Sequence, residues 1–172
     1  LSMPIVLPRL VAIDSSTLGN VARDFFSDSI SSRTKSRSFV NQLQEQGVFV
    51  SLTMTHVMEV IRHPDESVVI DRLAFLRALP YIAWLRPYDR NWFPGGIPDL
   101  LMRELHAFHH DSQKDWQSIR DHVRTDLWET GNGSEMFVDD DRLWRPFRKE
   151  AQRQLGKEMH VASVCRTDPM NI

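Results

Sequence analysis

The sequence lacks several features that would each indicate a class of protein. It holds one cysteine, Cys165, which excludes an internal disulfide framework and fits a reducing compartment. No apolar run approaches the roughly 20 residues of a membrane-spanning helix, and the first residues show no secretory signal. The formal net charge is −2, so the basic background of a non-specific nucleic-acid binder is missing. We expect a cytoplasmic protein with no membrane partner, which would meet any polyanion through a local basic surface.

Several catalytic signatures are missing as well. The chain contains no glycine-rich dinucleotide loop, no Walker-type loop, no Cys-x-x-Cys pair and no Gly-x-Ser-x-Gly elbow. Nucleotide-cofactor and serine-hydrolase chemistry therefore has no support. What remains is a chain of 172 residues, 41% of them apolar, which is enough for one domain with a sizeable core and an appended helical segment.

Three short apolar runs predict the strands of one sheet. They span residues 9–13, 48–52 and 81–85, and amphipathic helical patterns separate them. Strands that alternate with helices favour an α/β fold with neighbouring parallel strands, and the first run fits a strand buried on both faces. The serine-rich segment 27–38 is predicted to be an exposed loop before a helix that Gly47 stops.

The second half of the chain has a different character. Residues 91–98 are a Pro/Gly loop, and residues 99–130 are almost wholly helical in pattern, with no obvious fourth strand. The apolar stripe breaks across the polar stretch 109–115, which predicts either one bent helix or a hairpin of two helices. We divide the chain into an α/β core, residues 1–90, and a mostly helical insertion or extension, residues 91–172.

The acid that follows the first apolar run is the first candidate for function. Asp14 comes after Val11-Ala-Ile13 and before Ser15-Ser-Thr17. In open α/β sheets, ligands bind at the carboxyl ends of the strands, where a carboxylate meets solvent, metal or substrate. An Asp followed by serines is also a common helix cap, and for Asp14 taken alone capping is the more frequent use.

A second acid extends this candidate site. Glu59 lies on the helix predicted after the second strand, and a βααβα arrangement returns that helix to the sheet end where Asp14 lies. Two carboxylates with nearby hydroxyls suit Mg²⁺ or Mn²⁺, because hard ions take oxygen ligands. The opposing interpretation, a capping Asp14 and a solvent-facing Glu59, stays equally open.

These residues resemble a known family. Over roughly residues 9–87, the chain resembles the front half of PIN-like nucleases. The resemblance rests on four consecutive features: Val11-Ala-Ile-Asp14-Ser-Ser16, an amphipathic helix, Val48-Phe-Val-Ser-Leu-Thr53 and Val57-Met-Glu59-Val. The resemblance implies a three-layer α/β fold with a central parallel sheet, and an endoribonuclease that binds Mg²⁺ or Mn²⁺. It also implies that Asp14 and Glu59 are catalytic metal-site carboxylates and that Ser16 supports the site.

The family also requires a further acid, which the sequence does not place. That acid normally stands after the third strand, at the start of a helix that leads into the last strands. Asp89 and Asp99 come soon after the third strand, and residues 139–141 are consecutive aspartates, but no small-residue helix and strand follow them. A long helical insertion over residues 91–157, in a chain that stops before the fold is complete, would explain this departure. We therefore predict that the chain as given is an incomplete enzyme.

Histidines offer a competing metal site. The residues concerned are His56, Glu59 and His63 on one predicted helix and His106, His109 and His110 on a later one. Histidines and a Glu on one helix face can ligate Zn²⁺. The spacing is not His-Glu-x-x-His, however, and nothing singles out a later histidine as a further ligand. Surface or partly buried histidines near helix ends are the more common arrangement.

A basic helix near the end of the chain is the last candidate. Its cationic residues recur along one face and could track the phosphate backbone of a nucleic acid, with an exposed aromatic side chain stacking on a base. These residues are Arg142, Arg145, Lys149 and Arg153. The more common alternative is a solvated helix that packs Trp144, Phe147 and Leu155 inward.

Two hypotheses about function follow. The first is a metal-dependent nuclease that hydrolyses phosphodiester bonds of RNA, with an ion held by Asp14 and Glu59 that activates a water molecule. The second is a PIN-like domain with an incomplete site that serves as a nucleic-acid or protein binding or assembly module. The helical part is then the candidate surface for a protein partner or a second copy of the chain.

Overall fold

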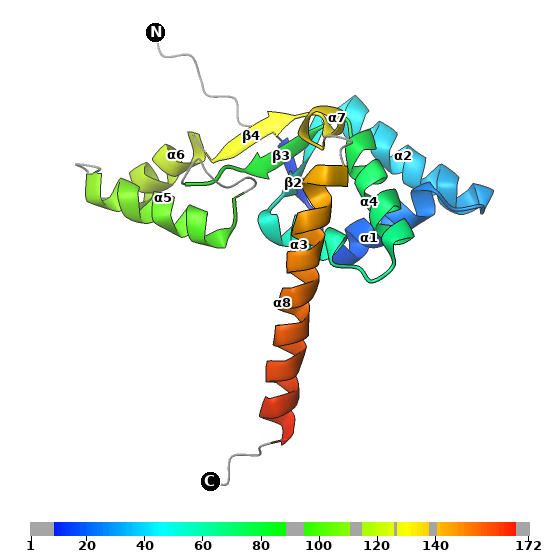
Figure 1. Ribbon diagram of the computed structural model, residues 1–172. Coiled ribbons are helices and arrows are strands. Elements are labelled where there is room, and N and C mark those ends of the chain that lie inside the picture. Colours follow the sequence, from blue (N-terminus) through cyan, green and yellow to red (C-terminus); the bar gives the residue numbers. More distant parts are fainter. Residues whose placement is uncertain (1–8, 89–94, 111–114, 126, 138–140, 168–172) are drawn as a thin grey trace.

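The computed structural model describes residues 9–88, 95–110, 115–125, 127–137 and 141–167 (Figure 1). These residues form a four-stranded sheet in the order β1-β2-β3-β4, together with eight helices. Within the helices and their ends, side chains are described except for residues 125, 136, 141–143 and 158–167.

The first three strands are parallel neighbours. β1 (Arg9–Ala12) pairs with β2 (Val48–Leu52), and β2 pairs with β3 (Ile82–Leu85). The prediction of three adjacent parallel strands in one sheet is therefore confirmed. The fold class is α/β, with an open and mostly parallel sheet.

A fourth strand completes the sheet and corrects the sequence analysis, which finds none. β4 (Trp128–Gly131) runs antiparallel to β3, with Trp128 opposite Leu85 and Gly131 opposite Ile82. This strand is short, its middle residues Glu129 and Thr130 are exposed, and it lies at the sheet edge. An edge strand of this kind has no buried apolar alternation, which is the pattern that predicts strands.

Four helices follow from the first half of the chain: α1 (Ser15–Phe25), α2 (Ile30–Gln46), α3 (Met54–Ile61) and α4 (Glu66–Ala78). Their apolar faces bury one face of the sheet and form the main core. The largest side chains fully enclosed there are Phe75, Leu18, Leu52, Ile61, Leu76, Leu79 and Ile82, with Val50 and Val69. Burial of this apolar surface is the main stabilising term for the fold.

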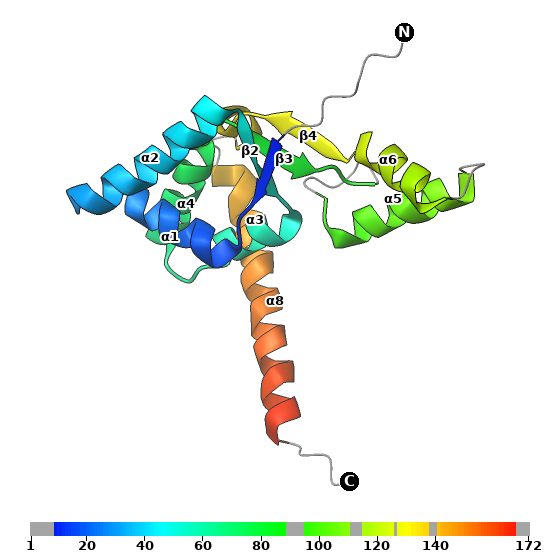
Figure 2. The ribbon, with the colours of Figure 1, turned by 180° about the vertical axis from the view of Figure 1, so that it is seen from behind.

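Two local expectations in this half are wrong. β1 is not buried on both faces, because it lies at the sheet edge and leaves Arg9, Leu10 and Ala12 exposed (Figure 2). The serine-rich segment 27–38 is not a loop throughout, because α2 begins at Ile30. Ser29 accepts a hydrogen bond from the backbone N–H of Ser32 at 3.4 Å and so caps that helix.

The second half contributes α5 (Ile97–His110), α6 (Trp116–Thr125), α7 (Gly133–Met136) and α8 (Asp141–Thr167). α5 and α6 are separate helices that lie side by side, as the hairpin alternative predicts (Figure 1). They share a small apolar cluster of their own, built on Ala107, Ile119 and Val123.

α7 and α8 return to the main core. Phe137, which follows α7, packs on Trp84 of β3 with ring centroids 4.9 Å apart, and Ala151 of α8 is buried in the main core. Trp144 packs inward as expected, but Phe147 does not, because 51% of it is exposed. The far end of α8 extends away from the body of the molecule (Figures 1 and 2). None of the described helices combines the length and apolar character of a membrane span.

Candidate functional site

Asp14 lies at the carboxyl end of β1 and caps α1. Its Oδ1 accepts hydrogen bonds from the Ser16 N–H at 3.0 Å, the Ser16 hydroxyl at 2.5 Å and the Thr17 N–H at 2.9 Å. Its Oδ2 accepts one from the Thr17 hydroxyl at 2.6 Å. Helices begin with unpaired N–H groups, so an Asp followed by two hydroxyl residues satisfies several donors at once. The capping role is therefore present in the structure.

These bonds also set the charge of Asp14. The hydroxyls of Ser16 and then of Thr17, together with the backbone N–H of Thr17, hold the pKa of the Asp14 carboxyl well below its ordinary value. The side chain stays exposed, and Oδ2 carries a single hydrogen bond. An oxygen with two lone pairs therefore keeps one acceptor position open to solvent or a ligand.

His56 connects α3 to the same edge of the sheet. Its Nε2 lies 3.0 Å from the carbonyl oxygen of Ile13, the residue before Asp14, and its Nδ1 lies 3.1 Å from the backbone N–H of Thr53. A carbonyl only accepts and an N–H only donates, which fixes the tautomer with the proton on Nε2. His56 is half-buried near the start of α3, as the interpretation of surface or partly buried histidines near helix ends expects, but its specific partners were not predicted. Its Nε2 holds α3 against the end of β1, and its Nδ1 caps the start of α3 itself.

Glu59 lies one helical turn beyond His56 in α3. Its carboxylate is 3.6 Å from the Arg62 guanidinium, and 31% of its side chain is exposed. It lines an open groove of about 210 Å³ between α3 and α8, together with Met58, Arg62 and Leu155. In the described part of the chain, no hydrogen bond or ion pair joins Glu59 to Asp14, and the contact that connects their elements is the one from His56 to Ile13.

The segment after β3 reaches this edge too. The Gly95 N–H donates to the carbonyl of Leu85 at 2.6 Å, and the Gly95 carbonyl accepts from the N–H of Met54, the first residue of α3, at 2.9 Å. A Cβ at Gly95 would lie 2.8 Å from the Arg86 carbonyl oxygen, so this close crossing requires glycine. Gly95 therefore lies between the carboxyl end of β3 and the first residue of α3.

Asp99, one of the candidates for the family's further acid, stabilises that loop. Its carboxylate accepts hydrogen bonds from the N–H groups of Tyr88 and Gly96, each at 2.7 Å. Asp89, Asp139 and Asp140 lie outside the described residues, as does the side chain of Asp141. Within the described ranges, no three His, Cys, Asp or Glu side chains come together as a group that could hold a metal ion.

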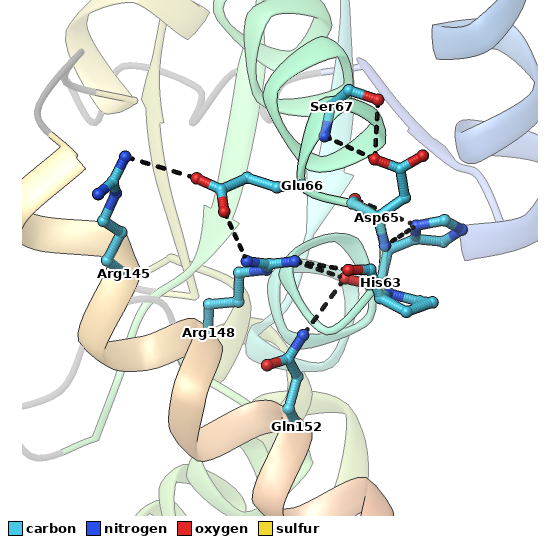
Figure 3. Close-up of polar contacts among 8 residues, drawn as sticks. His63, Asp65, Glu66, Ser67, Arg145, Arg148 and Gln152 are labelled. Carbon is cyan, nitrogen blue, oxygen red and sulfur yellow. Dashed lines mark hydrogen bonds and ion pairs between the residues drawn. The ribbon is translucent and has the colours of Figure 1, made fainter.

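The predicted basic face of α8 is partly paired (Figure 3). Arg145 lies 3.4 Å from Glu66, and Arg153 donates to Glu150, its neighbour one turn earlier, at 2.7 and 2.5 Å. That contact and one from Gln154 lower the pKa of Glu150 to about 2. The other two members of the face differ: Lys149 is exposed, and the Arg142 side chain lies outside the described residues. Binding of nucleic acid to this face stays a prediction.

Among the α8 cations whose side chains the structure describes, the least exposed is Arg148, which the sequence pattern does not single out. Arg148 is 14% exposed and donates to Glu66 at 3.1 Å, to the His63 carbonyl at 3.2 Å and to the Pro64 carbonyl at 2.9 Å (Figure 3). Gln152 also reaches the His63 carbonyl, at 3.5 Å. Carbonyls just after a helix carry partial negative charge, so a guanidinium is stable there. Arg148 therefore fastens α8 to the end of α3.

Comparison with family models, with curated proteins and with solved structures finds no match to this chain.

Proposed function

We propose that the protein is a metal-dependent nuclease of PIN-like type, in which Asp14 and Glu59 hold Mg²⁺ or Mn²⁺ and RNA is hydrolysed. The observation that supports this proposal is the bond from His56 to the Ile13 carbonyl at 3.0 Å. It holds the helix that carries Glu59 against the strand end that carries Asp14, which is where α/β sheets bind ligands. The same proposal includes a three-layer α/β arrangement of the fold and a cytoplasmic location of the protein.

The donor set fits a hard divalent cation. Mg²⁺ is bound in proteins by one or two carboxylates and keeps several water molecules, so two acids are sufficient. Asp14 offers an exposed Oδ2 with one hydrogen bond, and Glu59 forms a partly exposed ion pair with Arg62. A surface ion pair contributes little, so a cation could displace it. Ser16 supports the site because its hydroxyl fixes the orientation of the Asp14 carboxylate.

The ion would supply an activated water and stabilise charge on the leaving oxygen. The protein's own side chains position the reactants. Ser16 and Thr17 keep Asp14 ionised and in one orientation, and His56 keeps α3 in place. On α8, which packs on α3, the cations Arg142, Arg145, Lys149 and Arg153 would hold the phosphate backbone of the RNA.

Cleavage of single-stranded RNA with Mg²⁺ or Mn²⁺ tests the proposal, alongside the metal-induced rise in unfolding temperature. Asp14→Asn and Glu59→Gln are expected to abolish cleavage and reduce the rise, because each removes a charged ligand. The matched control is Asp65→Asn. Asp65 caps α4 through the N–H and hydroxyl of Ser67, as Asp14 caps α1 through Ser16, so it reports the cost of changing such a cap. Asp65→Asn should keep both cleavage and the metal-induced rise.

A second candidate function is a binding or assembly module of the same fold. The observation in its favour is that the Asp14 carboxylate already accepts four hydrogen bonds from its own helix. If Asp14→Asn keeps full cleavage and the full metal response, the nuclease proposal fails at this site. A wild-type protein with neither property would favour the module, with a protein partner or a second copy at the helical part.

A further inference from the structure

The helix α5 leaves a row of large apolar side chains without cover. Four of them, Ile97, Leu101, Leu105 and Phe108, recur at the spacing of one helix face, and Met102 lies beside them. Each of the five is between 45% and 66% exposed. We call these five residues the α5 stripe. A monomeric protein rarely exposes so many large apolar groups together, so the stripe indicates a contact surface.

The opposite face of α5 already packs on other parts of the protein, so α5 cannot rotate to bury the stripe. Ala107 is buried against Ile119 and Val123 of α6. Arg103 donates to the Pro87 carbonyl at 2.7 Å, and Asp99 accepts from the backbone of the loop that follows β3. These contacts fasten α5 to α6 and to the residues that follow β3, and they hold the stripe in one orientation.

We propose that the α5 stripe is the interface of a homodimer, in which two copies of α5 pack antiparallel about a two-fold axis near residue 103. A two-fold interface requires a surface that complements itself. Antiparallel pairing about this point sets Leu101 against the partner's Leu105 and Ile97 against the partner's Phe108. Each of these four side chains then meets another large apolar side chain, and the helix dipoles oppose each other favourably.

Area and charge favour a second copy of this chain as the occupant. The stripe exposes on the order of 500 Å² per copy, so pairing would bury on the order of 1,000 Å² in total, which is near the lower limit for a specific interface. The formal net charge is only −2, so long-range repulsion between two copies is weak. The interface deepens the assembly role considered above, and it does not rest on the metal site.

Sedimentation equilibrium of the full chain without metal or RNA tests the dimer. The wild type is expected to approach twice its 20.0 kDa mass at about 100 µM, and Leu105→Glu to weaken dimerisation about 30-fold or more by burying an unpaired charge. Ile70→Glu is the matched control, because Ile70 lies on α4 and is 50% exposed, as is Leu105. It should dimerise like the wild type. A wild type that stays monomeric overturns the proposal and assigns the stripe to a different partner.

A mixing experiment tests the antiparallel arrangement. Leu101→Glu and Leu105→Lys should each be monomeric, with circular dichroism confirming that both are folded. Mixed in equal amounts, they should recover a dimer, because an antiparallel pair places Glu at 101 against Lys at 105 of the other copy. Parallel helices would not bring these positions together, so failure to recover overturns the arrangement. Asp14→Asn should dimerise like the wild type, which separates this test from that of the nuclease.

Discussion

Two glycines show how the same substitution is expected to act in opposite directions. Gly47 ends α2 with φ 59°, a left-handed conformation, and Gly156 lies inside α8; a Cβ at either position meets nothing within 4 Å. Gly47→Ala should lower the free energy of unfolding by about 1 kcal/mol through backbone strain alone. Gly156→Ala should raise it by up to about 0.8 kcal/mol through helix propensity. Urea denaturation measures both, and equal signs would contradict this description.

The Asp14 cap should be visible in acid unfolding. The folded-state pKa of Asp14 is depressed, so its stabilising contribution is complete above its unfolded pKa of about 4 and is lost as pH falls toward the folded value. Ser16→Ala removes the largest cause of that depression. The stability of this variant should therefore fall less steeply than that of the wild type between pH 4 and pH 2. Two parallel stability curves would show that the Ser16 hydroxyl does not affect Asp14.

Part of the candidate site could be predicted from the sequence, residue by residue. Asp14 could be recognised both as a cap and as the acid at a strand end, because both depend on neighbours in sequence. The role of His56 could not, because its partner at Ile13 lies far away along the chain. One signal was present: Thr53-x-x-His56 has the spacing of a capping box, and His56 takes the position usually held by Glu or Gln.

Among whole elements, the attachment of α8 is expected to depend on Arg148 more than on Arg145. Arg148 makes three hydrogen bonds and is 14% exposed, whereas Arg145 makes an exposed ion pair with the same Glu66. Arg148→Ala should lower the free energy of unfolding by about 2 kcal/mol, because it leaves carbonyls and a carboxylate without a donor. Arg145→Ala should cost less than about 0.5 kcal/mol. Thermal unfolding of both variants checks this, and equal losses would mean that Arg148 does not anchor α8.

The strands that the sequence predicts most directly are those that lie inside the sheet. β2 and β3 lie inside the sheet with most of their apolar side chains buried, so their composition shows their position. β4 lies at the edge, where exposed residues give no pattern. The start of α2 was missed because serines have modest helix propensity. Tertiary contacts outweigh it, including the bond from the buried Ser36 hydroxyl to the Val21 carbonyl at 2.8 Å.

At the scale of the whole molecule, the buried apolar residues that the structure describes form two clusters of unequal size. The main core contains residues from all of α1–α4, from β2 and β3, and from α8, whereas the α5–α6 cluster has only Ala107, Ile119 and Val123 buried. β4 connects the two, since it follows α6 and pairs with β3. Stability in a protein is not uniform, and a region with few buried contacts opens before the rest. The α5–α6 hairpin is therefore expected to open while the sheet stays folded.

Hydrogen exchange of two core variants tests this expectation. Ile119→Ala, at a position 3% exposed, should speed amide exchange throughout α5 and α6 and leave β2 and β3 unchanged, because the lost contacts belong to the small cluster alone. Phe75→Ala, at a fully buried position of the main core, should cost about 3–5 kcal/mol and speed exchange of the slowest amides in β2 and β3. If Ile119→Ala speeds exchange in those strands equally, the two clusters unfold as one unit. In the homodimer, the α5 and α6 amides should exchange more slowly as protein concentration rises, because pairing stabilises the closed hairpin.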